Sequence, residues 1–251
     1  MAEYDNRYAA QPSGVGTRVD TQAGIDAGLR SYMLGVYNYM GLGVAFTAIV
    51  SLVLMSFFPQ VVYTIAATPL KWVLFAGILG LGWFSPRLIL SGSKAMAHGA
   101  YWLYAAMWGM LITPMVMGFF ASGAGGLVTL ALAITAVMFF SMSLLGYTTK
   151  KDLSGIGQFL AMAVIGLILA MLANYFFFQS GIFGFGISAL VVLVFAGITA
   201  WETQEIKQMY VAGDEGEQGR GKAIFGAFML YGSFVTMFIH ILSMLGFASG
   251  D

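Results

Sequence analysis

Seven long apolar stretches, with almost every charged residue confined to the gaps between them, constrain this chain more than any other feature. Most of the stretches hold about twenty residues, the length that an α-helix needs to cross roughly 30 Å of hydrocarbon. They begin near Leu34, Leu70, Tyr101, Leu127, Ile156, Ile182 and Ile224. Helices that are apolar all round belong in a membrane or a large core. The sequence therefore predicts an all-α polytopic membrane protein with seven transmembrane helices.

The composition agrees with this class and excludes several functions. Hydrophobic residues make up 59% of the 251 residues and charged residues only 9%, against roughly 25% charged in a soluble domain. A net charge of zero argues against nucleic acid as a partner, because phosphate neutralisation needs a basic face. The absence of cysteine excludes disulfides and thiolate catalysis. We expect a polar cytoplasmic tail over residues 1–30 and one transmembrane domain over residues 31–251, with no cofactor.

The basic residues predict how the chain is oriented in the membrane. Ten of the eleven Lys and Arg residues fall on one side of an alternating seven-span path, and only Lys71 falls on the other. The ten are Arg7, Arg18, Arg30, Arg87, Lys94, Lys150, Lys151, Lys207, Arg220 and Lys222. Because Lys and Arg accumulate on the cytoplasmic side of membrane proteins, we expect the N-terminus in the cytoplasm and the C-terminus outside.

Proline, glycine and polar residues predict the ends of the spans. Pro59 should stop the first span, and Pro86 should kink the second, because proline removes a backbone donor and clashes one turn back. The segment Gly123–Gly126 reads as a tight outer turn. Ser154 is a candidate N-cap for the fifth span. The segment Glu202–Lys222 is expected to be the longest inner loop.

Polar residues within or at the ends of the spans are the candidate site residues. A charge at the centre of a membrane helix costs roughly 2.5–3.5 kcal/mol, so such residues are rare without a function. Glu202 lies at the cytoplasmic end of span six and Arg87 at the same end of span two. His240 lies well inside span seven, with Ser233 seven residues earlier on the same helical face.

Each of these residues has an ordinary interpretation beside the functional one. Glu202 and Arg87 are either interfacial residues that extend to water, or a pair at the cytoplasmic mouth of a central cavity. In the second case the carboxylate would act as a proton-sensitive latch, paired when ionised and released when protonated. His240 is either a pH-titrating partner of that latch or a hydrogen-bonded packing residue.

Matches to catalytic motifs are weak, and we expect no enzyme. The run from Gly184 through Gly186 to Ala189 fits a dinucleotide-binding pattern, but it opens a membrane span without a βαβ unit. Ser91 and Lys94 have serine–lysine spacing in a short basic loop that lacks the accompanying motifs. The two histidines are far apart, and no aspartate lies inside a predicted span. A zinc centre and an intramembrane aspartyl protease are therefore unsupported.

Two segments carry a resemblance to a known family. The runs FAGITAWETQEIKQMY and LLGYTTKKDLSGIGQFL, followed by a glycine-bounded last span, resemble the Bax inhibitor-1 (transmembrane Bax-inhibitor motif) family, in particular its bacterial branch. The resemblance extends from Arg30 to the end of the chain. It implies six helices around a central seventh, a location in the inner (plasma) membrane, and either a pH-sensitive calcium leak or modulation of a membrane-bound AAA protease.

The resemblance also assigns site residues. Glu202 occupies the position of a family aspartate in span six, and Ser233 that of a partner aspartate in span seven. Arg87 corresponds to an arginine of span two. Two carboxylates can share a proton, whereas one carboxylate beside a hydroxyl cannot. The serine also removes an oxygen charge that calcium would use, which leaves Glu202 as the candidate calcium ligand and predicts weaker calcium selectivity.

The residues and the resemblance together leave two hypotheses. In the first, the chain is a proton-modulated calcium or cation leak pathway gated at Glu202, with Arg87, Ser233 and His240 along the ion path. In the second, it is a non-conducting protein that binds a membrane-bound AAA protease through residues 1–30 and the long inner loop. The lipid bilayer is a partner in both cases, and the sequence does not fix the oligomeric state.

Overall fold

The computed structural model describes residues 15–91, 93–211 and 217–250, with side chains from residue 27 onward in the first range and from residue 219 onward in the last. Within these residues every regular element is a helix. The elements are α1 (Val15–Phe57), α2 (Pro59–Ala67), α3 (Leu70–Ile89), α4 (Lys94–Ala121), α5 (Gly125–Thr148), α6 (Ser154–Ala173), the π-helical segment η1 (Asn174–Phe178), α7 (Gly181–Gln208) and α8 (Glu217–Ser249).

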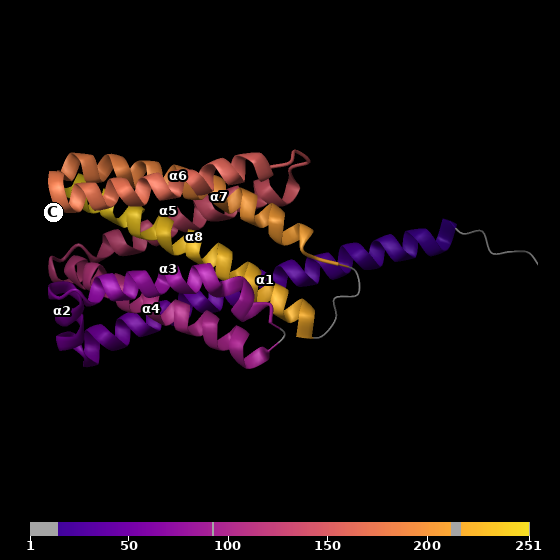
Figure 1. Cartoon of the computed structure of the whole chain (residues 1–251), viewed down its shortest axis with the longest axis horizontal. Coiled ribbons are helices and arrows are strands. Elements are labelled where there is room, and N and C mark those ends of the chain that lie inside the picture. Colours follow the sequence, from indigo (N-terminus) through magenta and orange to yellow (C-terminus); the bar gives the residue numbers. More distant parts are fainter. Residues whose placement is uncertain (1–14, 92, 212–216, 251) are drawn as a thin grey trace, which may run out of the picture.

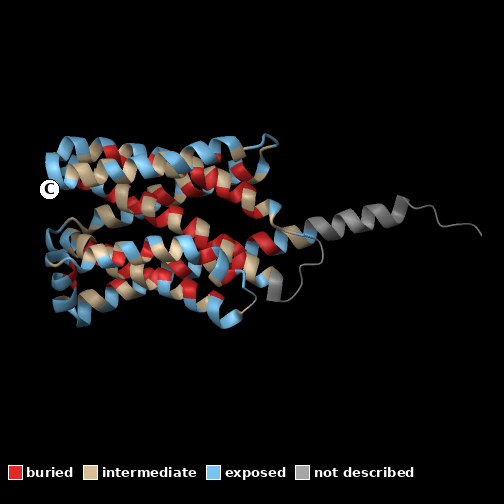
Figure 2. Cartoon of the chain, viewed as in Figure 1, coloured by how far each residue is buried: buried red, intermediate tan, exposed pale blue. Residues whose placement is uncertain are grey.

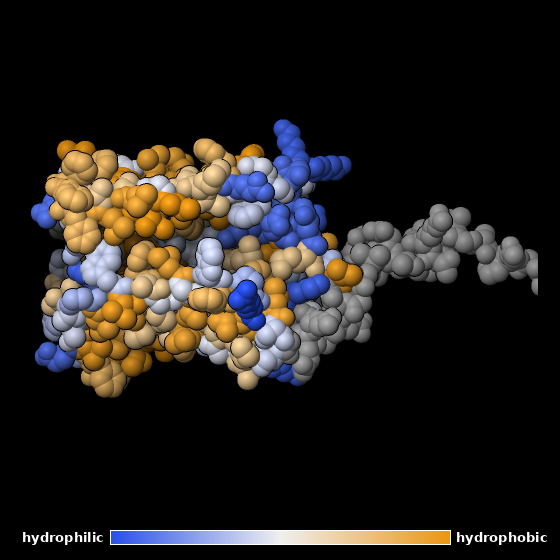
Figure 3. Space-filling view, viewed as in Figure 1, coloured by the Kyte–Doolittle hydropathy of each residue, from blue (hydrophilic) through white to orange (hydrophobic). Residues whose placement is uncertain are grey.

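Seven of these helices are long and apolar enough to cross a membrane. They are α1 from Ala27 onward, α3, α4, α5, α6 together with η1, α7, and α8 from Gly219 onward. Figure 3 shows the wide apolar surface that they present along the bundle. Water could not solvate that surface, whereas lipid chains can, and each helix satisfies its backbone polar groups internally. The prediction of an all-α polytopic membrane protein with seven spans is confirmed.

Burial differs sharply between the spans. In α8, 67% of an apolar 18-residue stretch is buried, against 6% in α6. Figure 1 shows α8 crossing between a layer that contains α6 and α7 and a layer that contains α3 and α4, and α8 packs against α1, α3, α4, α5 and α7. Figure 2 shows the buried residues gathered along the facing sides of these helices. The core of the molecule therefore follows α8, and α6 lies at its margin.

Charged residues gather at one end of the bundle, which we call the basic end. Helices α3, α5 and α7 end there and α4, α6 and α8 begin there, while α2 and the connections α4–α5 and α6–α7 lie at the opposite end (Figure 1). Hydrophilic side chains concentrate at the basic end in Figure 3. Its described basic residues are Arg30, Arg87, Lys94, Lys150, Lys151, Lys207, Arg220 and Lys222, whereas Lys71 lies at the opposite end.

Several predicted boundaries shift in the structure. Pro59 follows the end of α1 as expected, but it also begins the short helix α2, because proline suits the first helical position. Helix α7 continues through Glu202 to Gln208, so the segment Glu202–Lys222 does not form a loop from its start. Helical hydrogen bonds do not require apolar side chains, and a span can extend into water. Helix α1 passes without a break through residue 30, where we placed the boundary between the tail and the transmembrane domain. Residues 1–14 of the predicted tail lie outside the described residues.

The start of α6 differs from the prediction for a specific reason. Ser154 is the first helical residue and not the N-cap, a position that Leu153 occupies without a side-chain bond. The carboxylate of Asp152 instead accepts hydrogen bonds from the Ser154 hydroxyl (2.6 Å) and the Ser154 backbone N–H (2.9 Å). These two bonds lower the pKa of the Asp152 carboxyl below its ordinary value. An aspartate therefore supplies the helix-start interaction that we had assigned to the serine.

Candidate functional site

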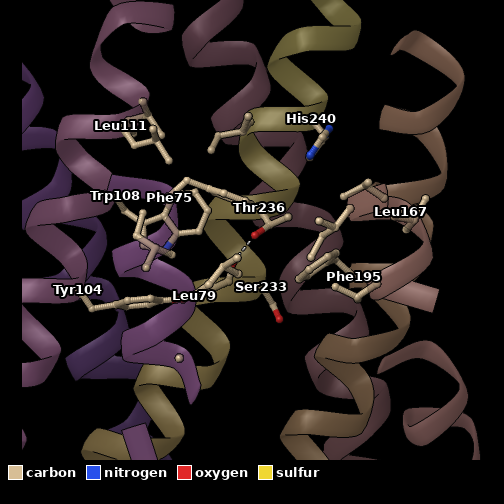
Figure 4. A pocket seen from close by; sticks show the side chains of 18 of the residues that line it. Phe75, Leu79, Tyr104, Trp108, Leu111, Leu167, Phe195, Ser233, Thr236 and His240 are labelled. Atoms are coloured by element: carbon tan, nitrogen blue, oxygen red, sulfur yellow. Dashed lines mark hydrogen bonds between the residues drawn. The ribbon is translucent and has the colours of Figure 1, made fainter. Parts of the chain in front are cut away.

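A cavity of about 790 Å³ lies inside the bundle, between α3, α4, α6, α7 and α8. Figure 4 shows Phe75, Leu79, Tyr104 and Trp108 on one side of it and Leu167 and Phe195 on the other, with α8 between them. Most of its walls are aromatic or aliphatic. Its volume falls within the range of about 300–1,000 Å³ that small-molecule sites occupy.

Glu202 lines this cavity at the end nearer the basic end of the bundle. Its side chain is only 9% exposed, and its Oε2 accepts a hydrogen bond of 2.7 Å from the hydroxyl of Ser233, which is 2% exposed. The bond joins α7 to α8, which pack against each other. Glu202 is therefore a buried residue and does not extend to water at an interface.

Arg87 does not complete the predicted pair. It is exposed on the last turn of α3 and does not line the cavity, although its neighbours Ser85 and Pro86 do. Within the described residues no ion pair joins it to Glu202. Successive residues on a helix point about 100° apart, so the turn that directs Ser85 inward directs Arg87 outward. The expected approach of Arg87 to Glu202 is absent from this structure.

A row of polar side chains on α8 lines the cavity beyond Glu202. Ser233, Thr236 and His240 follow one another along it, as Figure 4 shows. The Thr236 hydroxyl donates 2.8 Å to the carbonyl of Gly232, which leaves its oxygen free to accept from the cavity. Trp108 Nε1 also lies in the wall, buried and without a hydrogen-bond partner among the described residues. The cavity therefore offers polar atoms at several depths.

His240 stands between this cavity and a second one. The second cavity, of about 850 Å³, lies at the opposite end and is lined by Asn174, Ser188 and Ser243 as well as His240. His240 Nδ1 is 3.1 Å from the Ser188 hydroxyl, a hydrogen bond that links α8 to α7. Met115, Met171, Tyr175 and His240 line both cavities, so these side chains lie between the outer cavity at the opposite end and the inner cavity that reaches Glu202.

Helices α1, α7 and α8 pack closely on the side of Glu202 that faces the basic end. Ile206, one turn further along α7, is completely buried, and so is Ala227 on α8. A Cβ added to Gly226 would lie 2.9 Å from Ile206 and 3.3 Å from Val36, so α1, α7 and α8 meet there without spare volume. On the side of α3 the cavity continues past this contact, because Pro86 on α3 and Phe225 on α8, both nearer the basic end than Ser233, also line it.

The polar residues that follow Glu202 hold the α5–α6 connection. The Gln204 side chain accepts from the backbone N–H of Leu153 and donates to the carbonyl of Lys151, both at 2.8 Å. Lys207 Nζ donates 2.9 Å to the carbonyl of Tyr147 and lies over its ring. Sequence reasoning did not assign these roles, although the run of polar residues after Glu202 was a visible signal.

The acidic residues do not form a conventional metal centre. Within the described residues no group of three or more His, Cys, Asp or Glu side chains is close enough to hold a metal ion. Among the described residues, Glu202 is the only acidic one in the wall of the inner cavity. A hard cation at that position would meet one carboxylate together with hydroxyl and carbonyl oxygens.

The fold and the site define a polytopic helical membrane protein with a buried carboxylate in an internal cavity. Comparison with known proteins places it more closely: the family model described as "Inhibitor of apoptosis-promoting Bax1" matches residues 29–250. The chain belongs to this family, the Bax inhibitor-1 family, as its sequence motifs predicted.

Relatives from several bacteria match nearly the whole chain. The inner membrane protein YbhL of Escherichia coli is 33% identical over 229 residues, covering 88% of this chain and 93% of YbhL. The uncharacterized protein YrjE of Lactococcus lactis is 35% identical, covering 89% of this chain and 94% of YrjE. An uncharacterized protein of Rickettsia prowazekii is 33% identical, covering 88% of this chain and 91% of its own length.

Proposed function

We propose that this chain is a slow, proton-modulated cation leak pathway with Glu202 as its gating carboxylate and calcium among its permeant ions. The role is not enzymatic and requires no cofactor. The observation that carries the proposal is a carboxylate that is 9% exposed, faces a cavity, and is hydrogen-bonded to a hydroxyl. An ionised carboxylate buried without a cation is costly, so a proton or cation that arrives through the cavity would supply the missing partner.

The polar row on α8 supports a route to that carboxylate. A cation entering through the outer cavity would meet His240 first, then Thr236, and then the pair formed by Ser233 and Glu202. Close packing around Ile206 and Gly226 would obstruct the pathway between α1, α7 and α8 beyond Glu202. Opening then requires α7 and α8 to separate at that level, and a change in the protonation of Glu202 would alter the bond that joins them.

We also propose the orientation that the basic residues predicted. The basic end would face the cytoplasm, so the outer cavity would open to the external side. The similarity to YbhL, an inner membrane protein, supports the inner membrane as the location. Glu202 would then sample external ions while the close packing of α1, α7 and α8 obstructs the way to the cytoplasm.

Flux measurements test the proposal directly. Purified protein is reconstituted into vesicles that contain a calcium indicator, and flux is followed from about pH 6 to 8. The Glu202→Gln variant should lose the pH dependence of the flux. Glu205→Gln is the matched control, because it changes a glutamate one turn away on α7 that does not line the cavity. Its pH dependence should remain that of the parent.

Two outcomes would overturn the proposal. Flux with an unchanged pH response in Glu202→Gln would exclude this carboxylate as the gate. Folded protein that passes no ions at any pH would favour the second hypothesis, in which the chain modulates a membrane-bound AAA protease without conducting.

A further inference from the structure

Helix α6 carries an apolar stripe that no helix covers in the part of the chain that the structure describes. Its one buried residue is Gly157, near its first turn. Further along, Val164, Leu167, Ile168 and Met171 recur at the spacing of one helical face, and all four line the inner cavity. Within the described residues α6 packs on α7 and continues into η1. The stripe therefore faces cavity volume where a neighbouring helix would normally lie.

The wall across the cavity from this stripe is α3, and the ring contacts described between α3 and the span formed by α6 and η1 lie near one end. At the opposite end of the bundle the ring of Trp72 lies 5.1 Å from that of Tyr175 and 6.0 Å from that of Phe176 in η1. At the basic end α6 is fixed to α7, because Gly157 lies directly against the ring of Trp201. Between these two attachments, α3 and α6 border the cavity without packing on each other.

The cavity is continuous with the lipid-facing surface along this gap. Leu79 on α3 lines the cavity and is also 47% exposed. Gly82, one turn further along α3, also lines the cavity, and a Cβ added there would have no atom within 4 Å. Figure 3 shows this face of the molecule hollowed between its upper and lower bands. The part of the cavity between α3 and α6 has apolar walls and can accept an apolar molecule.

We propose that the acyl chain of a membrane phospholipid enters sideways between α3 and α6 and occupies the inner cavity. The bilayer supplies this ligand at high local concentration. Because the acyl chain comes from lipid and not from water, it is held by contacts with Leu79, Leu167 and the aromatic walls, in place of an empty space. An acyl chain at this position would fill the volume through which an ion would have to pass.

Trp108 provides a probe inside the proposed site. It lines the cavity and is 7% exposed, whereas Trp83 on α3 is 83% exposed to the bilayer. Two proteins are compared in vesicles of brominated phosphatidylcholine, one retaining only Trp108 and the other only Trp83, with the remaining tryptophans changed to Phe. Bromine quenches tryptophan fluorescence on contact. Strong quenching of both is expected, and absence of Trp108 quenching would overturn the proposal.

A matched pair of glycines tests the route of entry. Gly82 and Gly80 both lie in α3 with nothing within 4 Å of an added Cβ, but only Gly82 lines the cavity. In the Trp108 protein, Gly82→Leu should weaken acyl-chain binding about tenfold, because the added side chain fills the entrance. Gly80→Leu should leave the quenching unchanged. Equal quenching in the two variants would exclude entry at Gly82.

A second measurement uses the unaltered sequence, which avoids loss of folding by the tryptophan changes. Phosphatidylcholine with a photoreactive group in mid-chain is crosslinked in vesicles, and the adducts are located by mass spectrometry. Adducts on Phe228 or Trp108, which are buried in the wall, are expected together with those on exposed residues. Adducts on exposed residues alone would overturn the proposal. Neither measurement depends on ion flux, so a failed leak would not affect the result.

Discussion

The hydroxyl of Ser233 donates a 2.7 Å hydrogen bond to the carboxylate of Glu202, and this bond spans the interface between α7 and α8. Both side chains are buried and both face the inner cavity. A hydroxyl can donate one proton to the carboxylate but cannot hold a charge of its own. The contact therefore stabilises one arrangement of the two helices and leaves Glu202 as the single titrating member of the pair.

Replacing Ser233 by aspartate should create a carboxylate pair at this contact. Two acids this close cannot both ionise easily, so they would share a proton and titrate as a coupled unit. We expect the flux of Ser233→Asp vesicles to change with pH more steeply than that of the parent. The double variant Glu202→Gln/Ser233→Asp has one acid again and should lose the added steepness. A profile unchanged by Ser233→Asp in folded protein would contradict the prediction.

Gln204 should stabilise the α5–α6 connection. Its side chain bonds the backbone of both Lys151 and Leu153, and Gln204→Ala leaves a donor and an acceptor there unpaired. A loss of about 2 kcal/mol in the free energy of unfolding is expected, at about 1 kcal/mol for each bond. Thermal unfolding in detergent measures it. Gln208→Ala, at an exposed position at the end of the same helix, should be nearly neutral, and similar losses in both variants would refute the role of Gln204.

Gly146 should be required for the contact between α5 and α7. A Cβ at this position would run into the backbone carbonyl of Ala200, which cannot move aside as a flexible side chain can. Gly146→Ala should therefore destabilise the protein by about 1–3 kcal/mol, the usual cost of overpacking. Gly126→Ala changes a glycine of the same helix that has open space around it, and it should be neutral or slightly stabilising. Equal melting temperatures in the two variants would show that the helices can separate at little cost.

Asp152 should give stability a small dependence on acidic pH. Hydrogen bonds from Ser154 lower the pKa of this carboxyl in the folded state. A group with a lowered folded-state pKa stabilises the protein above its unfolded pKa, about 3.9 for aspartate, and loses that effect as pH falls through the folded-state pKa. Asp152→Ala should therefore be less stable than the parent at neutral pH, and the difference should disappear in stronger acid.

The matching variant for this prediction is Ser154→Ala, which removes the hydroxyl donor to Asp152. The double variant should be about as stable as Asp152→Ala, apart from any effect of replacing serine by alanine on the helix backbone. Both changes break the same bond between hydroxyl and carboxylate, so their effects should not add. A stability difference that persists unchanged through the acid range would show that the carboxylate charge is not involved.

The number and type of the membrane helices could be predicted from the sequence because hydrocarbon imposes a length and an apolar composition on any spanning helix. The ends of the helices were harder to predict, because the helical hydrogen bonds can continue past the last apolar residue into water. Helix α4 begins at Lys94, well before the apolar run at Tyr101, for this reason. The π-helical segment η1 and the left-handed residue Gln179 that ends it (φ 48°) had no signal in the apolar pattern.

The candidate site was predictable only in part. The polar residues Glu202 and Ser233 stood out in apolar surroundings, and the resemblance to a family placed them opposite each other. The partner of Glu202 could not be predicted in this way, because the position of a charged residue near the end of a span does not show in which direction its side chain points. Arg87 lies just past Pro86 and faces outward. The lateral gap beside α6 depends on which helices do not touch, and a single sequence contains no such information.

The attachment of α6 at its two ends also bears on how the molecule assembles and comes apart. Membrane helices form first and associate afterwards, and each helix is held in the bundle more strongly when it makes more contacts. With 6% of its apolar stretch buried, α6 contributes least to that association and α8 most. Helix α6 should thus dock last during assembly and detach first under short-chain detergents, as a local opening that leaves the remaining six spans together. Partial unfolding of this protein would then begin at its most lipid-exposed helix, well before the contact between α7 and α8 is lost.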